Sequence, residues 1–107
     1  MATREECEQA LVVLGTRLSS GKASLPDRTV SCEIPDLAVT YSGQLRQGAL
    51  TEITDSAQPR AQVRLIVRSD DLVELVAGTL AFGTAYRDGR LKVQASFRDL
   101  LTLRSLA

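Results

Sequence analysis

The spacing of apolar residues changes near residue 28, and this change limits the possible folds more than any other feature of the chain. Before it, apolar residues recur at helical spacing, at Cys7, Ala10, Leu11, Leu14 and Leu18. Thr3 and Glu6 precede them in a capping-box pattern, so we predict an amphipathic helix that ends near Leu18. After it, apolar and polar residues alternate, as in strands with one buried face. Both periods in one short chain indicate a mixed α and β fold.

Four runs with strand periodicity fill the middle of the chain. The runs "RTVSCEI" and "LAVTYSGQL" are joined by Pro35-Asp36 and predict a β-hairpin. A short third strand is predicted in "QGALTEI", after a turn at Gln47-Gly48, and a fourth in "AQVRLIV". The alternation leaves one apolar face on each strand, so the strands should share one sheet with a buried side.

The last third of the chain returns to helical patterns. Ser69 is predicted as the N-cap of a helix that carries Asp70 and Asp71 in its first turn and ends at Gly78. A short helical turn is predicted over 84–88, a fifth strand over 90–95, and a last helix after Ser96. This order predicts an α+β domain with a mostly antiparallel sheet and helices over one face. The pattern leaves the neighbours of the fifth strand open.

Composition excludes several classes of chemistry. The chain has 107 residues, enough for one domain over 1–107, and it contains no histidine. Without histidine, the most common general base and metal ligand are missing, and no Ser-His or Cys-His pair can form. We therefore expect neither a metal nor a cofactor. Cys7 and Cys32 are expected as buried thiols in a reducing compartment, with a disulfide as the less favoured alternative.

Charge and hydropathy bound the location and the partners. Thirteen basic and thirteen acidic residues balance, so a nucleic-acid partner is not expected. Acidic residues near the N-terminus and the lack of an apolar run of about 20 residues predict a cytoplasmic protein. Eleven of the thirteen basic residues are arginine, which is typical of a GC-rich bacterial genome.

Two local patterns suggest chemistry, and each has a simpler explanation. Asp70 and Asp71 could form an acid/base pair or a cation site, but carboxylates in a first helical turn ordinarily serve to cap the helix. Gly78, Gly83 and Gly89 could suggest a phosphate loop. Their spacing matches neither the dinucleotide-binding nor the P-loop pattern, so we reject that hypothesis.

The segment from Val63 to Arg104 resembles the sterol carrier protein 2 (SCP2) family. The motifs that carry this resemblance are Ser69-Asp70-Asp71, Gly78-x-Leu80, Ala85-Tyr86 and Gly89-Arg90-Leu91-Lys92-Val93. Residues 1–60 agree only in the order of their helix and strands. The chain departs from the family at Ala95-Ser96, where a Gly-Asp pair is usual, and in a short, leucine-rich last helix.

The resemblance implies a five-stranded sheet with helices over one face and an apolar tunnel between the two layers. It implies that the tunnel binds a lipid, fatty acyl or sterol-like molecule. The residues that would line the tunnel are Leu72, Leu75, Val76, Phe82, Tyr86, Phe97, Leu100, Leu101 and Leu103. Protein interiors usually pack densely, so the alternative for these residues is an ordinary core, with Tyr86 as a half-buried cap.

Three functions remain open at this level. The first is a non-catalytic carrier that binds a hydrophobic small molecule. The second is a module without a pocket that forms a homodimer or supports a partner enzyme through the sheet or the first helix. The third is a small enzyme that works without histidine. Arg87, Arg90 and Lys92 form a basic edge that could contact a membrane surface transiently, although charged side chains also commonly protect a strand edge.

Overall fold

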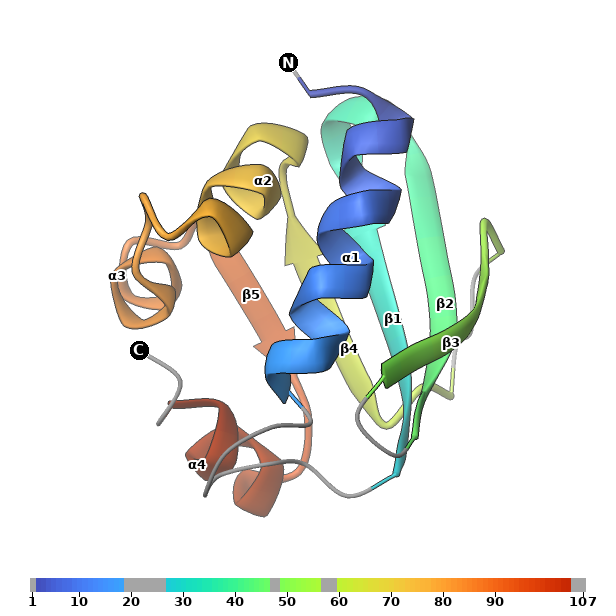
Figure 1. The fold of residues 1–107 in the computed structure, drawn as a ribbon. Helices are drawn as coiled ribbons and strands as arrows, with labels where there is room; N and C mark the ends of the chain where they lie inside the picture. Colours follow the sequence, from blue (N-terminus) through green and yellow to red (C-terminus); the bar gives the residue numbers. More distant parts are fainter. Residues whose placement is uncertain (1, 19–26, 47–48, 57–59, 105–107) are drawn as a thin grey trace.

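The elements of the chain follow the predicted order. The computed structural model describes residues 2–18, 27–46, 49–56 and 60–104, so the predicted turn at Gln47-Gly48 lies outside the described residues. The elements are α1 (Arg4–Leu18), β1 (Arg28–Ile34), a 3-10 turn η1 (Pro35–Leu37), β2 (Val39–Arg46), β3 (Ala49–Thr54), β4 (Val63–Val67), α2 (Ser69–Ala77), α3 (Phe82–Arg87), β5 (Leu91–Gln94) and α4 (Phe97–Arg104) (Figure 1).

The strands form one sheet in the order β3-β2-β1-β4-β5. β1 pairs antiparallel with β2 and parallel with β4, and the remaining pairs, β2 with β3 and β4 with β5, are antiparallel. The predicted mostly antiparallel, five-stranded sheet is confirmed. The neighbour that the sequence left open is β4, which pairs with β5 at Leu65–Val93 and Val67–Leu91. β3 and β5 therefore form the two edges.

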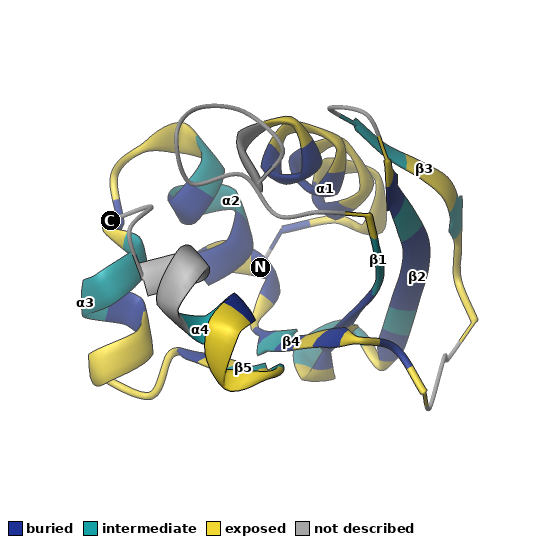
Figure 2. Cartoon of the chain, turned by 90° about the horizontal axis from the view of Figure 1, so that it is seen from below, coloured by how far each residue is buried: buried dark blue, intermediate teal, exposed yellow. Residues whose placement is uncertain are grey.

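The helices lie on one face of a strongly twisted sheet (Figures 1 and 2). α1 packs against β3 and α2, and α3 packs against β5. α4 follows β5 at the lower end of the sheet in Figure 1. Within the described ranges, no helix is both long and apolar enough to cross a bilayer. The helices thus form a second layer, with the core between it and the sheet.

The core lies where the alternating strand residues meet the stripe of α1 and the apolar side of α2. The buried apolar residues of the strands are Val30, Cys32, Ile34, Val39, Tyr41, Leu45, Val63, Leu65, Val67 and Leu91. Cys7, Ala10, Leu11 and Leu14 of α1 complete this cluster with Leu72 and Leu75 of α2. On the other face of the sheet Glu33, Arg64 and Lys92 are exposed. The period of two in the sequence therefore separates a buried face from a polar one.

Two of the predicted helix starts have different outcomes. The backbone N–H of Thr3 donates to Glu6 Oε1 (3.0 Å) and the N–H of Glu6 donates to Thr3 Oγ1 (3.1 Å), which confirms the capping box. The prediction that Ser69 is an N-cap is wrong, because Arg68 occupies the N-cap position and Ser69 is already helical.

Asp36, on the turn η1, takes over the capping of α2. Its carboxylate accepts the Ser69 backbone N–H at 2.9 Å and the Ser69 hydroxyl at 2.5 Å. Because Asp36 lies 33 positions before Ser69, a tertiary contact replaces the local cap that the sequence suggested. The cap also links the hairpin β1–β2 to α2.

Candidate apolar binding region

Two glycines with positive φ set the ends of the segment between α2 and β5. Gly78 (φ 84°) closes α2, and the N–H groups of Thr79 and Leu80 both donate to Glu74 O. Gly89 (φ 77°) follows α3, and the next N–H, of Arg90, donates to Ala85 O at 2.9 Å. Since residues with a Cβ rarely adopt this backbone conformation, glycine is favoured at both turns. The predicted role of Gly78 is confirmed, and the short helix begins two residues earlier than expected.

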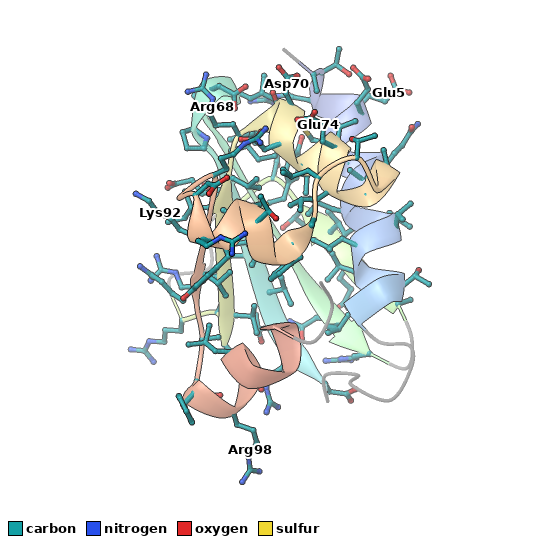
Figure 3. The ribbon with its side chains drawn as sticks, turned by 90° about the vertical axis from the view of Figure 1, so that its left-hand side faces the viewer. Glu5, Arg68, Asp70, Glu74, Lys92 and Arg98 are labelled. Carbon is teal, nitrogen blue, oxygen red and sulfur yellow. The ribbon has the colours of Figure 1, made fainter. Side chains whose placement is uncertain are left out.

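Arg90 ties the start of β5 to α2. Its Nη2 atom lies 2.6 Å from Asp71 Oδ1 and 3.2 Å from Glu74 Oε2, and its Nε–H also donates to Asp71 Oδ1. The hydrogen bond to Asp71 raises the pKa of Arg90 above its already high value. Figure 3 shows Glu74 on α2, near the labelled Asp70 of the first turn. Asp71 therefore forms an ion pair with Arg90 of the same chain. This leaves the hypothesis that Asp70 and Asp71 form an acid/base pair without geometric support.

A second ion pair attaches α4 to the start of β1. Arg28 Nε–H donates to Asp99 Oδ2 at 3.0 Å, and Nη2 lies 3.5 Å from Oδ1, so the contact is bidentate. The side chain of Asp99 is only 3% exposed. The backbone N–H of Asp99 donates to the Ser96 hydroxyl oxygen at 3.2 Å, so the predicted Ser96–Asp99 cap is present on one side. These contacts position the last helix through charge, with Arg28 contributed from 71 residues away.

Seven of the nine predicted ligand-binding residues have described side chains, and these occupy three different environments. Leu72 and Leu75 are buried in the core, and Val76, Phe82 and Leu100 are half-buried. Tyr86 is 50% exposed and Phe97 is 77% exposed. The side chains of Leu101 and Leu103 lie outside the described residues. The half-buried members come from α2, α3 and α4, which lie with β5 on the left of Figure 1, and we call them and the half-buried Val93 of β5 the apolar strip. Val76, Phe82 and Val93 pack against the buried core.

A small cavity lies beneath α1, on the helix-covered face of the sheet and toward its β2–β3 edge. It measures about 10 Å³, room for about one water molecule, and is lined by Leu11, Val30, Cys32, Tyr41, Ser42, Gly43, Leu50 and Ile53. None of the nine predicted residues is among them. The cavity and the apolar strip are thus separate features of the domain.

Both thiols are buried and unpaired, as the composition suggested. Cys7 and Cys32 are free cysteines, and burial raises the pKa of Cys7 to about 11 and that of Cys32 to about 12. A thiol with a raised pKa carries little thiolate and is a poor nucleophile. In the part of the chain that the structure describes, no three His, Cys, Asp or Glu side chains gather as metal ligands.

Comparison with known families places this architecture. The model of the family described as alkyl sulfatase C-terminal matches residues 1–106. The chain belongs to this alkyl sulfatase C-terminal family. A comparison with curated protein sequences gives no match.

Solved structures connect the family to the SCP2-like fold. A double mutant of the sec-alkyl sulfatase Pisa1 of Pseudomonas sp. is 25% identical, with a TM-score of 0.69 over 98% of this chain and 16% of that chain. Sterol carrier protein 2 like 2 from Aedes aegypti is 14% identical, with a TM-score of 0.66 over 97% of this chain and 98% of that chain. The palmitated form of that mosquito protein is 13% identical, with a TM-score of 0.62 over 97% and 93%. The predicted SCP2-like fold is confirmed, and this chain spans about one sixth of the sulfatase chain.

Sequence reasoning missed the polar contacts that hold this alkyl sulfatase C-terminal domain together. Local patterns place Asp36 in a turn and Arg28 at the start of a strand, with no partner for either. Each contacts a residue at least 33 positions away, Asp36 at Ser69 and Arg28 at Asp99. Only the position of Asp99 in a first helical turn offers a signal, and it points to helix capping.

Proposed function

We propose that this domain is a non-catalytic module that binds the apolar chain of an amphiphile, such as a fatty acyl, alkyl or sterol-like molecule. The observation that carries the proposal is the apolar strip of Val76, Phe82, Val93 and Leu100. A single partly exposed apolar side chain is ordinary in a monomeric domain, whereas several on neighbouring elements are typical of a ligand-binding surface. The palmitated relative from Aedes aegypti, which shares the fold, supports an acyl chain as the guest.

The ligand would bind between α2, α3 and α4, on the helix side of β5. Its polar head would remain near the exposed Tyr86, whose hydroxyl can donate or accept a hydrogen bond while the ring stays in apolar contact. Leu72 and Leu75 would form the floor of the site from the core. An apolar tunnel requires α3 or α4 to move outward, and the Arg90–Asp71 and Arg28–Asp99 contacts would limit that movement.

Chain-length dependence is the sharpest test. Each methylene that leaves water contributes about 0.8 kcal/mol, so affinity for a series of fluorescent fatty acids should rise about fourfold per buried carbon until the site is filled. We expect Val76→Asp to weaken binding by at least about tenfold, because it places a charge in the apolar strip. Val12→Asp is the matched control, since Val12 is 51% exposed on α1, away from the strip.

Circular dichroism would first establish that both variants fold. The proposal fails if the wild-type chain takes up no member of the series. It also fails if folded Val76→Asp and Val12→Asp proteins bind equally well.

A second candidate is an accessory module that serves a partner enzyme without binding a ligand. It is favoured by the match to one sixth of an alkyl sulfatase chain, where this domain accompanies much more protein. Native mass spectrometry separates the two proposals. Release of a lipid from the purified chain supports the carrier, whereas a ligand-free protein that forms a stable dimer and takes up no fatty acid supports the accessory module.

A further inference from the structure

Two aromatic residues lie exposed on neighbouring parts of this domain, and each is followed by an exposed arginine. Phe97 is 77% exposed at the start of α4, before Arg98, and Tyr86 is 50% exposed near the end of α3, before Arg87. In Figure 2 the exposed end of α3 and the exposed first turn of α4 flank β5 on the same side. Lys92 of β5, which is also exposed, projects outward there (Figure 3). We call Tyr86, Arg87, Lys92, Phe97 and Arg98 the aromatic–basic edge.

The acidic residues near this edge are mostly occupied. The Asp99 carboxylate is buried and paired with Arg28, so it presents little charge outward. Asp71 and Glu74 are paired with Arg90. Two exposed acids remain: Asp88 within residues 86–98, and Glu33 of β1, which aligns with Lys92 across Ile66 of β4. They stand against the exposed cations Arg87 and Lys92. On β4, beside β5, Arg64 adds a further exposed cation opposite Gln94. The edge therefore carries an excess of positive charge around two exposed aromatic rings.

A different exposed apolar pair provides the contrast. Val12 and Val13 of α1 are 51% and 43% exposed, but the first turns of the same helix carry exposed Glu5, Glu6 and Glu8 against one exposed cation, Arg4. An anionic surface would repel this helix and attract the aromatic–basic edge. Apolar exposure alone does not distinguish the two surfaces, whereas their charge does.

We propose that the aromatic–basic edge docks this domain on the surface of an anionic lipid bilayer. Aromatic side chains are favoured at the boundary between headgroups and acyl chains, and basic side chains gain from the negative surface potential. Phe97 inserts, Tyr86 lies at headgroup level, and Arg87 and Lys92 contact the headgroups. The docking does not depend on binding of a ligand between the helices. It would bring the apolar strip next to a source of amphiphiles.

Vesicle sedimentation with the 107-residue chain tests this proposal. Vesicles of mixed phosphatidylcholine and phosphatidylglycerol are compared with pure phosphatidylcholine vesicles. We expect binding to the mixed vesicles that weakens as salt is added, and much weaker binding to the neutral ones. Lys92→Gln should reduce the partition coefficient about fivefold, as expected for one cation at an anionic surface. Phe97→Ser should reduce it about tenfold through the loss of a partly inserted ring.

Two matched variants on other surfaces serve as controls. Val12→Ser removes an exposed apolar side chain from α1, and Arg46→Gln removes an exposed cation from β2, and neither should change the partition coefficient. Binding that is absent, independent of phosphatidylglycerol, or reduced as much by the controls would overturn the proposal. If Phe97→Ser instead dissociates a dimer in sedimentation equilibrium, the edge is an interface between two copies, and the bilayer proposal is wrong. Uptake of a monomeric fatty acid by Lys92→Gln separates this result from a failure of the proposed carrier function.

Discussion

Around β3, helix and sheet are joined by close backbone contact, whereas around β5 ion pairs add to the apolar packing of Leu91 and Ala85. A Cβ added to Gly15 of α1 would lie 2.8 Å from the backbone nitrogen of Leu50 on β3, so the two backbones are in tight contact. Near β5, Arg90 binds Asp71, and Arg28 binds Asp99 of α4, while Phe97 remains exposed. Close packing resists displacement, whereas the partly exposed ion pairs of Arg90 with Asp71 and Glu74 are weaker. The β5 side is thus better suited to open for a ligand.

Truncation of one large apolar residue on each side should give the largest difference. Leu11 of α1 is 2% exposed, and we expect Leu11→Ala to lower the free energy of unfolding by about 3 kcal/mol, since it enlarges the cavity beneath α1. Phe97→Ala should cost less than about 0.5 kcal/mol, because its ring contributes little to the core. Urea denaturation of both variants measures the two values. Equal costs would show that α4 packs as firmly as α1.

Gly15→Ala tests the close contact directly. The added methyl group must displace α1 or β3, and we expect a loss of about 2 kcal/mol in unfolding free energy, even after the gain in helix propensity. Gly78→Ala is the informative control, because a Cβ added there would meet no atom within 4 Å, yet its φ of 84° is unfavourable for alanine. It should cost about 1 kcal/mol. A stabilised Gly15→Ala protein would contradict the tight contact.

Arg28→Gln examines the ion pair that holds α4. It leaves the buried Asp99 carboxylate without its cation, and we expect a loss of about 1.5 kcal/mol. Hydrogen exchange should show the increase in opening concentrated in α4 and not in α1. If α1 and α4 lose protection from hydrogen exchange equally, the ion pair stabilises the whole domain and does not specifically hold α4 in place.

Acid should weaken the link between η1 and α2 by a smaller amount. The Ser69 hydroxyl lowers the pKa of Asp36, partly offset by its burial. A carboxyl whose pKa is lowered by folding stabilises the fold at any pH above its pKa in the unfolded chain, 3.8. This contribution is lost as the pH falls through the pKa of the folded state. The unfolding free energy of the wild type should therefore decline more steeply below about pH 4 than that of Asp36→Asn. Parallel curves would remove Asp36 from the acid response.

More of the fold than of the candidate site could be predicted from the sequence. Local spacing indicated every strand, and Gly78 indicated the end of α2, because these features depend on neighbouring residues. Partners for Arg28 and Asp36 could not be predicted, since the contacts form only after distant segments meet. Leu72 and Phe97 show the same limit for apolar residues: both fit a helical stripe, but one is buried and the other is exposed. Spacing identifies the apolar side of a helix and says little about what covers it.

The central place of β1 has a consequence for the order in which the chain gains its structure. Its partner β2 follows after a short turn, so β1, β2 and β3 can pair at a small cost in loop closure. The parallel partner β4 is reached only after the chain has crossed the sheet, and β5 can join only after β4. Non-local pairing of this kind is slow. A folding φ-value is the effect of a mutation on the folding barrier divided by its effect on stability. We expect these values to be near one half or higher in β1–β3 and near zero in β5 and α4. The part of the domain assigned to the ligand would then also be the last to fold.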